Sequence, residues 1–425
     1  MKGKRRWLEV IKSLLILLLS ASAIFLLTMT PLVQDSGVLD LLTTRQPDSV
    51  GSTEVTLTAA AIPSRMAVRS GTECYGVQYD QNSVDELFAR LGPLLGEALV
   101  SSTEQKIIGE RLWRRYLQGE GIYFDFTGDI PLSALSSWLQ PEGFCGLTAA
   151  ARRILLASAD NDKVLLCYQD AGDGRFYACD TALTWSLHLA PAVSDISGND
   201  AEFAFDSQTL SGLLEPYTLI TEDSTRKIYN ATTPLSVGGD LSDLLEALEY
   251  TGRNHASVSG GELYLDGNDR LQIQAGGQVS YTAAQPGKYP VATAGEEMTI
   301  AEAIEAARQL AESTIGAKCG EAELYLQSAQ EVSDGYLIYF GYRLDGSMVW
   351  LYDKGWAAEF YVRYDHITDF TLYFRSYVST GADALLLSMD RAAGMLPNLV
   401  EQSCELIIQY RDQGESQVQP VWVAK

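Results

Sequence analysis

The sequence predicts an α+β protein in which an N-terminal transmembrane helix precedes extracytoplasmic domains of capped helices and antiparallel β-sheets. Three observations support this prediction. An uncharged apolar run follows a basic N-terminus, capping residues precede several segments with helical periodicity, and short alternating segments are separated by glycine-containing turns. Helical segments and runs of hairpin strands follow one another in blocks, which is typical of α+β domains.

The predicted transmembrane helix spans residues 13–30. Residues 13–29 read SLLILLLSASAIFLLTM and carry no charge, and about 18 helical residues cross most of a ~30 Å hydrocarbon core. Glu9 is the one acid before residue 30, whereas the basic residues there are Lys2, Lys4, Arg5, Arg6 and Lys12. This bias predicts a single-pass protein of the cell membrane, with residues 1–12 in the cytoplasm and the bulk of the chain outside.

The same run also fits a signal peptide that is cut after Ala21-Ser22-Ala23. Such a cut would fall inside the apolar run and leave Ile24–Leu27 as an apolar new terminus. The run is also longer than the ~7–15 apolar residues of a signal peptide. We therefore expect an uncleaved anchor. No cysteine precedes Cys74, so a lipid-modified N-terminus would lack its acceptor thiol.

The composition of the predicted extracytoplasmic part argues against nucleic-acid binding. The chain of 425 residues has a net charge of −24. Five basic residues and one acid lie before residue 31, so the remainder holds 26 basic and 54 acidic residues, a balance of −28. A surface this acidic repels nucleic acid and anionic lipid headgroups. Because the acids are spread along the chain rather than blocked, we interpret them as a solubilising surface.

Length and composition predict three domains after the anchor. Residues 31–56 are polar, with Pro47 and Gly51-Ser52, and are expected to form a juxtamembrane linker. We expect an N-terminal extracytoplasmic α+β domain at 57–215, a middle α+β domain at 216–290 and a C-terminal α+β domain at 291–425.

In the first domain, Ser83 and Glu86 predict a capping box, and Pro93 is expected to kink or end the helix that follows. A second helix is expected at about 103–117, and a short one begins at 129–131. Strands are expected around Ala67-Val68, at 75–79, 122–126 and 203–205, and in a hairpin of 164–169 with 175–180.

In the middle domain, Asp240 is expected to cap a leucine-rich helix, followed by strands 262–266, 271–274 and 279–281. In the C-terminal domain, Thr299 and Glu302 predict a second capping box. Strands follow at 323–331, 336–344, 347–353, 357–364 and 368–375, then a helix at about 383–396 and a closing hairpin of 406–410 with 418–423.

The sequence contains no recognisable reactive centre, so we predict no catalytic residues, no cofactor and no metal site. His188, His255 and His366 lie far apart and have no partner at metal-ligand spacing. No nucleophile elbow, phosphate-binding loop or dinucleotide fingerprint is present. Two acidic turns, 160–162 and 266–269, lack the Gly and Glu positions of a calcium loop.

Six cysteines outside the predicted membrane segment permit disulfides. Cys167 and Cys179 are the best candidate pair, because they flank the turn 171–174 at equal distance from Asp173 and could face each other across a hairpin. Free buried thiols are the alternative, since cross-strand disulfides are often strained and a chain of this size needs no covalent staple.

The order of parts resembles the YycH and YycI family. The likeness rests on the basic N-terminus with its single anchor, on residues 241–281 with LYLDG and GQVSY, and on a C-terminal third with YFGYRLDG at 339–346 and PVW at 420–422. These proteins are single-pass regulators of an essential two-component sensor histidine kinase that governs cell-wall homeostasis. The resemblance therefore implies an accessory signalling protein whose partners are that kinase and a paralogous single-pass regulator. It supplies no catalytic residues.

Two other classes of function stay open from the residues. One is an extracytoplasmic binding module resembling peptidase propeptides, which share the helix-then-strands plan of 299–364. The other is an enzyme acting on cell-wall glycan, which would need polar side chains converging in a cleft. A regulator needs an anchor and no reactive centre.

Partner recognition within the membrane is predicted at Ser20 and Ala23. Lipid tails provide no hydrophobic drive for helices to associate, so contacts between helices depend on small residues and polar side chains. Ser20 and Ala23 are three residues apart and share a helix face, between leucine-rich halves. A serine can also hydrogen-bond to its own helix backbone, which is the structural alternative.

The anchor predicts a measurable topology. In intact cells, protease should digest the extracytoplasmic chain, while the N-terminal segment stays with the membrane fraction. Membrane fractionation with N- and C-terminal epitope tags measures both. Recovery of a soluble product that begins at Ile24 would show that the run is a cleaved signal peptide instead.

Overall fold

The structure is a computed structural model that describes residues 59–71, 75–139, 143–199, 201–220, 225–235, 240–251, 254–295, 297–396 and 403–425. The predicted cytoplasmic segment, transmembrane helix and linker therefore lie outside the described residues, as do Ser20 and Ala23. The described residues, from 59 onward, belong to one compact unit. Within the described ranges, no helix combines the length and the apolar composition that crossing a bilayer requires.

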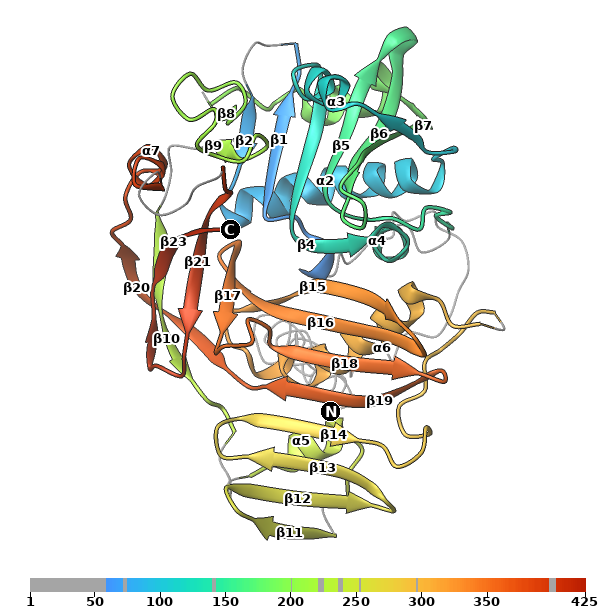
Figure 1. Ribbon diagram of the computed structural model, residues 1–425, viewed down its shortest axis with the longest axis vertical. Coiled ribbons are helices and arrows are strands. Elements are labelled where there is room, and N and C mark those ends of the chain that lie inside the picture. The colour runs from blue at the N-terminus through green and yellow to red at the C-terminus, as the bar shows by residue number, and fades with distance from the viewer. Residues whose placement is uncertain are drawn as a thin grey trace, which may run out of the picture. The chain divides into compact units, whose positions relative to one another are not determined.

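Seven of the described strands form an antiparallel sheet with the order β2-β1-β4-β5-β6-β7-β3 (Figure 1). The strands are β1 Arg65–Arg69, β2 Gly76–Gln78, β3 Lys106–Ile108, β4 Gly121–Pro131, β5 Ala150–Ala159, β6 Lys163–Asp170 and β7 Phe176–Thr184. The central strand β4 reads as an almost continuous apolar run because both of its faces are buried. Ile122 and Phe124 pack in one core cluster, and Tyr123 packs in the cluster on the other face.

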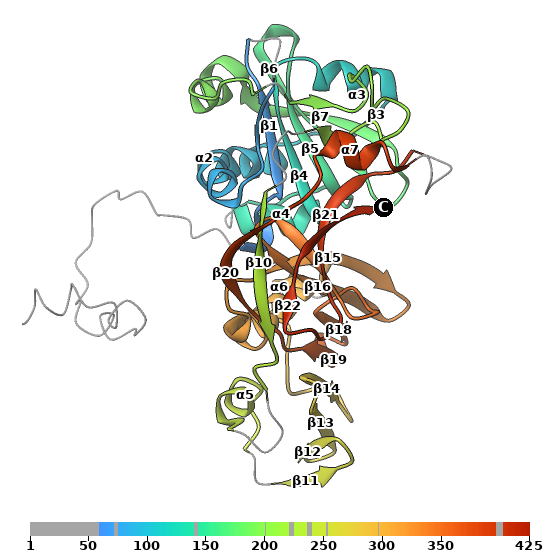
Figure 2. The ribbon, with the colours of Figure 1, turned by 90° about the vertical axis from the view of Figure 1, so that its left-hand side faces the viewer.

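Helices cover both faces of this sheet (Figure 2). Helices α2 Gln81–Val100 and α4 Leu132–Leu139 bury their apolar residues in the cluster on one face. Helix α3 Glu110–Leu117 buries Trp113 and Leu117 in the cluster on the other face. The two-sided cover explains why charged side chains inside this sheet must find partners within the protein.

Eleven described strands form a second sheet that forks at β16. Along one edge β16 pairs with β15, and along the other it pairs with β18 over its first half and with β17 over its second half. One branch continues through β19, β14, β13, β12 and β11, and the other through β21 and β23. The strands are β11 His255–Val258, β12 Gly261–Asp266, β13 Asp269–Gln274, β14 Gln278–Thr282, β15 Glu323–Val332, β16 Gly335–Leu344, β17 Ser347–Leu351, β18 Ala358–Arg363, β19 His366–Tyr373, β21 Leu406–Asp412 and β23 Pro420–Ala424.

Smaller elements complete the described unit. A three-stranded sheet has the order β20-β10-β22, and β8 pairs with β9. These strands are β8 Glu202–Phe203, β9 Leu219–Ile220, β10 Arg226–Thr232, β20 Ser376–Ala384 and β22 Gln417–Val418. The remaining helices are α5 Ser242–Ala247, α6 Ile300–Ser313 and α7 Met389–Ala393, with short helical turns at η3 Ala59–Ala61, η4 Asp160–Asp162, η5 Trp185–Leu189, η6 Pro191–Val193 and η7 Gly316–Lys318.

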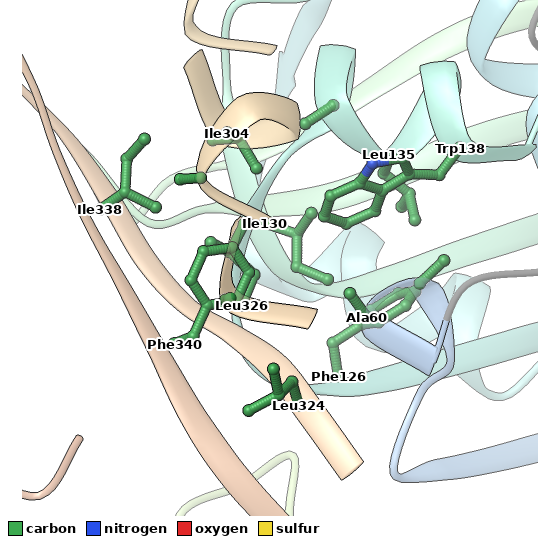
Figure 3. Packing of buried hydrophobic residues seen from close by; sticks show 14 of the residues in the cluster. Ala60, Phe126, Ile130, Leu135, Trp138, Ile304, Leu324, Leu326, Ile338 and Phe340 are labelled. Atoms are coloured by element: carbon green, nitrogen blue, oxygen red, sulfur yellow. The ribbon is translucent and has the colours of Figure 1, made fainter. Parts of the chain in front are cut away.

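One hydrophobic core joins the two large sheets (Figure 3). Phe126 and Ile130 of β4 share it with Leu326 of β15 and Phe340 of β16. On its rim, the Trp138 Nε1–H of α4 donates a 2.9 Å hydrogen bond to Glu305 of α6. Burial of these side chains removes apolar surface from water at about 25 cal/mol per Å², so the sheets stabilise each other.

The backbones of β4 and β15 cross at Gly128. A Cβ atom at this position would lie 2.3 Å from the Leu326 carbonyl oxygen and 2.5 Å from that of Gln327. Real Cβ atoms do not approach backbone so closely, so the crossing requires glycine. The pairing of β4 with β5 is also irregular between Asp125 and Ile130, which gives β4 the bend that it needs to reach β15.

Most of the predicted elements are confirmed. The capping box of Thr299 and Glu302 is present at α6, and the hairpin of β6 and β7 lies where its turn predicts it. The strands expected at 262–266, 271–274 and 279–281 correspond to β12, β13 and β14, and the five expected between 323 and 375 correspond to β15 to β19. The closing hairpin is formed by β21 and β23.

Several predicted boundaries in the first domain are wrong. The cap of α2 is Asp80 rather than Ser83, because the Asp80 carboxylate accepts the Ser83 backbone N–H. Pro93 does not end α2, since Leu95 and Leu99 beyond it are buried in the core and hold the helix in place. The helix expected at 103–117 begins only at Glu110, because residues 106–108 pair with β7 as an edge strand.

Two further predictions fail where pairing with distant strands overrides local pattern. The helix expected at 383–396 is limited to α7, and β20 extends to Ala384 because it pairs with β10. Strands β3, β5, β9, β10, β11 and β20 were not predicted. The strand expected at 203–205 is shorter, with only Glu202–Phe203 paired to β9.

Paired strands connect the segments on either side of the predicted domain boundaries at 215/216 and 290/291. Strand β14 of the middle segment pairs with β19 of the C-terminal segment, and β10 pairs with both β20 and β22. Whether the three segments fold separately stays a prediction.

The crossing at Gly128 predicts a specific loss of stability. Gly128→Ala should lower the free energy of unfolding by about 1–3 kcal/mol, because the added methyl group must push the β15 backbone away. Gly146→Ala is the matched control, since a Cβ there meets nothing within 4 Å. Urea unfolding of the full-length variants measures both. Equal stabilities would show that β4 can move without cost.

Candidate functional site

Six charged side chains form a buried network beside the crossing of β4 and β15. Its members are Arg65, Asp125, Arg152, Arg153, Glu215 and Glu405. Arg152 lies at the centre. Its guanidinium donates to Glu405 at 2.5 and 2.6 Å and to Asp125 at 3.1 Å. Because Asp125 is fully buried and Glu405 nearly so, both carboxylates depend on these arginines.

The flanking arginines complete the network. Arg65 of β1 lies 2.5 Å from the second oxygen of Asp125. Arg153 forms a bidentate pair with Glu215, with both distances 2.8 Å, and lies 3.6 Å from Glu405. Three positive and three negative charges are therefore matched, and the geometry is typical of a structural network rather than of a catalytic centre.

A strand irregularity allows the neighbouring Arg152 and Arg153 to reach the same network. Successive side chains of a regular strand point to opposite faces. Ala151 and Ile154 belong to one core cluster although they are three residues apart, and the pairing of β5 with β6 shifts between them. The two arginines occupy this irregular segment.

The network sets the protonation of Glu405. Burial alone would raise the pKa of the Glu405 carboxyl, but Arg152, Arg153 and Arg65 together hold it well below its usual range. Glu405 precedes β21, so its charge fixes the C-terminal hairpin to the N-terminal sheet. Backbone hydrogen bonds between Glu405 and Lys425, at 2.8 and 3.1 Å, close the same hairpin.

Three cavities adjoin the network, and all three are lined by both Arg152 and Lys425. Together we call them the junction cleft. The largest has a volume of ≈ 660 Å³ and lies between β4 and β5 on one side and β15, β17, β21 and β23 on the other. The C-terminus lies beside this junction (Figure 1). A space of this size accommodates a small-molecule or short-peptide ligand.

The largest cavity is lined by both apolar and polar side chains. Its cationic side chains are Arg152, Arg411 and Lys425, and Asp129 is the acidic side chain among the described lining residues. Amide side chains come from Gln327, Gln409 and Gln413, and Trp350 adds a ring that is 38% exposed. The ring lies over Gly355, where a Cβ would come within 2.8 Å of it.

Three residues that line this cavity each hold a polar atom that is buried away from the open space and has no hydrogen-bond partner among the described residues. The atoms are the hydroxyl oxygens of Thr127 and Tyr325 and the amide oxygen of Gln327. Tyr325 is 2% exposed, and burial raises the pKa of its hydroxyl. Its ring lies across Gly341, where a Cβ would come within 2.6 Å, so the glycine in YFGYRLDG makes room for it.

The candidate disulfide is absent from this structure. Cys167 and Cys179 are free thiols, and the register places Cys167 opposite Ala178 and Cys179 opposite Leu166. Their side chains therefore point to opposite faces, Cys167 into one core cluster and Cys179 into the other. Burial raises the pKa of the Cys179 thiol to about 11, as expected for a structural cysteine.

The histidines lie on separate elements. His188 Nδ1 accepts the Thr184 backbone N–H, His255 stacks on Tyr264, and His366 Nδ1 lies 2.7 Å from the Tyr364 carbonyl oxygen. In the described part of the chain, no group of three His, Cys, Asp or Glu side chains is placed to hold a metal ion. The predicted contact residues Ser20 and Ala23 lie outside the described residues.

The network and the cleft were not predicted from the sequence, although charged residues within apolar segments pointed to the network. Arg152-Arg153 interrupts an apolar segment, Asp125 lies inside the aromatic run of β4, and Glu405 directly precedes the apolar start of β21. Charged residues inside buried strands indicate paired charges. Their partners could not be read from the sequence, since Arg152 and Glu405 are 253 residues apart.

The network predicts an acid-sensitive stability. A carboxyl whose folded-state pKa is lowered contributes stability above its unfolded pKa of about 4.5, and this contribution is lost as pH falls toward the folded value. Glu405→Gln should cost about 3–5 kcal/mol at pH 7, because it leaves buried guanidinium groups unpaired, and should flatten the loss of stability below pH 4.5.

Urea unfolding at pH values from 3 to 7 measures this dependence. Glu86→Gln, which removes an exposed acid of α2, is the control and should change the free energy of unfolding by less than about 0.5 kcal/mol. Parallel pH curves for the wild type and Glu405→Gln would contradict the role assigned to this carboxylate.

Comparisons with known proteins identify the fold. No protein-family model matches the sequence, and no curated protein matches it significantly. The solved structure of YycH from Bacillus subtilis is similar with a TM-score of 0.51 and 13% sequence identity, over 88% of this chain and 96% of that chain. The described unit therefore has a YycH-like α+β fold, which extends over nearly the full length of the solved chain.

Proposed function

We propose that this protein is a membrane-anchored extracytoplasmic accessory protein that modulates a two-component sensor histidine kinase through protein–protein contacts. The observation that carries this proposal is the similarity of fold to YycH along most of the chain. The resemblance in the order of anchor, leucine-rich helix and C-terminal strands points the same way. The partners would be the kinase and a paralogous single-pass regulator, both in the cell membrane.

The geometry favours a regulator over the alternative enzyme. The most concentrated group of buried charges, around Arg152, is neutral overall and mutually paired. A glycan hydrolase needs two carboxyl groups facing each other across a substrate cleft, whereas the largest cavity has Asp129 as its carboxylate among the described lining residues. A propeptide-like module would instead need a protease partner, which co-purification can test.

The recognition surface within the membrane gives the sharpest test. Ser20→Leu combined with Ala23→Leu should leave membrane insertion intact, because leucine favours the bilayer, but should keep a partner helix from approaching closely. Crosslinking to the sensor kinase should fall, while protein level and topology hold. A site-specific photo-crosslinker in the anchor, read by immunoblot, measures this.

A matched control is available in the same helix. Ala21→Leu with Ser22→Leu makes the same change in composition, but at about 3.6 residues per turn both positions face away from Ser20 and Ala23. The control should crosslink like the wild type. If both double variants crosslink normally, recognition resides in the extracytoplasmic part. If no crosslink to a sensor kinase forms even in the wild type, the proposed function fails.

A further inference from the structure

The described helices cover only one face of the large sheet. Helices α5 and α6 lie behind strands β12, β13, β14, β16, β18 and β19 in Figure 1, and Figure 2 shows both helices on the same side of these strands. On that side, Leu244 of α5 and Ile304 and Ala307 of α6 are buried in the core. We call the opposite side of these six strands the open face. Antiparallel sheets can leave such a face in contact with water.

A row of polar side chains crosses the open face. The pairing register places these residues side by side from β13 to β16. The members of the row, all half-exposed, are Gln272, Ser280, Thr371, Glu359 and Tyr339. Neighbouring strands lie about 4.8 Å apart, so the row extends roughly 20 Å at right angles to the strands. It therefore offers amide, hydroxyl and carboxylate groups to an extended ligand.

Aromatic rings continue the row at its β16 end. The ring centroids of Tyr339 and Trp356 lie 5.7 Å apart, and Tyr373 lies 5.4 Å from Trp356. Tyr352 lies 5.4 Å from Tyr373, and these two rings pack against the core. Tyr339 and Trp356 are half-exposed and belong to none of the core clusters. Core packing therefore accounts for Tyr352 and Tyr373, whereas Tyr339 and Trp356 leave ring surface in contact with solvent.

The charges of the open face cancel. Arg363 lies 3.3 Å from Asp334 in the turn before β16 and 3.7 Å from Asp369 of β19. Among the accessible side chains of the six strands on this face, Arg270 and Arg363 balance Glu359 and Asp369. A surface without net charge neither attracts nor steers a strongly charged ligand. Charge matching therefore favours an uncharged ligand over an acidic polymer or a basic peptide.

We propose that the open face binds an uncharged carbohydrate chain that lies across the strands. The rings of Tyr339 and Trp356 stack on the apolar faces of the sugar rings, and the polar row exchanges hydrogen bonds with the sugar hydroxyls. A protein partner is a poorer match, because protein interfaces have a core depleted of charged groups. The centre of this face is instead occupied by Ser280, Thr371 and Glu359.

This binding goes beyond the proposed function and does not depend on it, because it needs no kinase. It also differs from the alternative of a glycan hydrolase. The row contains one carboxylate, Glu359, whereas hydrolysis of a glycosidic bond uses a pair that flanks the bond. We therefore assign binding without cleavage to the open face.

Isothermal titration calorimetry of the full-length chain, in a detergent without a sugar headgroup, tests the proposal. The uncharged probes are cellotetraose and tetra-N-acetylchitotetraose, and the acidic probe is tetragalacturonate. We expect 1:1 binding of at least one uncharged probe. The acidic probe should bind at least roughly ten-fold more weakly, because Glu359 and Asp369 repel its carboxylates.

Variants locate the binding on the open face. Trp356→Ala should weaken binding roughly ten-fold or more, because it removes the larger of the two exposed rings. Gln272→Ala with Thr371→Ala should weaken binding roughly three- to ten-fold, and it keeps the test valid if Trp356→Ala lowers the melting temperature. Phe144→Ala is the matched control, since it removes a ring that is 81% exposed but lies outside the large sheet. It should bind like the wild type.

Four results would overturn the proposal. One is no binding of either uncharged probe. Another is binding that Trp356→Ala and the double variant of Gln272 and Thr371 leave unchanged. The third is equally tight binding of tetragalacturonate. The fourth is capture of a protein in intact cells by a photo-crosslinker at Thr371, lost in Trp356→Ala, which would assign the face to a protein partner. The kinase crosslink from the anchor is measured separately, so failure of either experiment leaves the other informative.

Discussion

The crossing of β4 over β15 is the constraint on which the rest of the structure depends. Because the residue at 128 is glycine, the two backbones approach within a distance that no Cβ allows. On one side of the crossing, Phe126, Ile130 and Leu326 join the two sheets in a shared core. The cavities of the junction cleft adjoin the same contact. The same contact therefore both stabilises the fold and adjoins the largest of the three cavities, whose lining includes Gly128.

Charge pairing fixes the edge of that cleft. Arg152 donates hydrogen bonds to Asp125 of its own sheet and to Glu405, the residue before β21. Ion pairs therefore tie the C-terminal hairpin to the N-terminal sheet. Backbone hydrogen bonds between Glu405 and Lys425 close the hairpin itself. A buried network of this kind contributes more to a specific arrangement than to net stability, since desolvation offsets much of the attraction. Each arginine of the network is paired with a carboxylate. Arg226 and Arg411 lie outside the network and line two of the cavities.

The strongly shifted carboxyl and thiol groups among the described residues are explained by contacts within the protein. Within the described residues, the strongly lowered carboxyl pKa belongs to Glu405, and ion pairs rather than a reactive partner account for it. Thiols such as Cys167 lie in core clusters, where burial raises their pKa and suppresses the thiolate.

The sequence by itself determined the elements that depend on interactions between neighbouring residues. The capping box of Thr299 and Glu302, the turn between β6 and β7, and the α+β class follow from neighbouring residues, and so does the prediction of a transmembrane helix at 13–30. Tertiary structure decided whatever depends on distant partners. Pairing with β10 makes residues up to 384 a strand, burial of Leu95 and Leu99 carries α2 past Pro93, and the register separates Cys167 from Cys179. The candidate site belongs to this second group, because its walls and charges come from strands up to 300 residues apart that meet only where Gly128 lets two backbones cross.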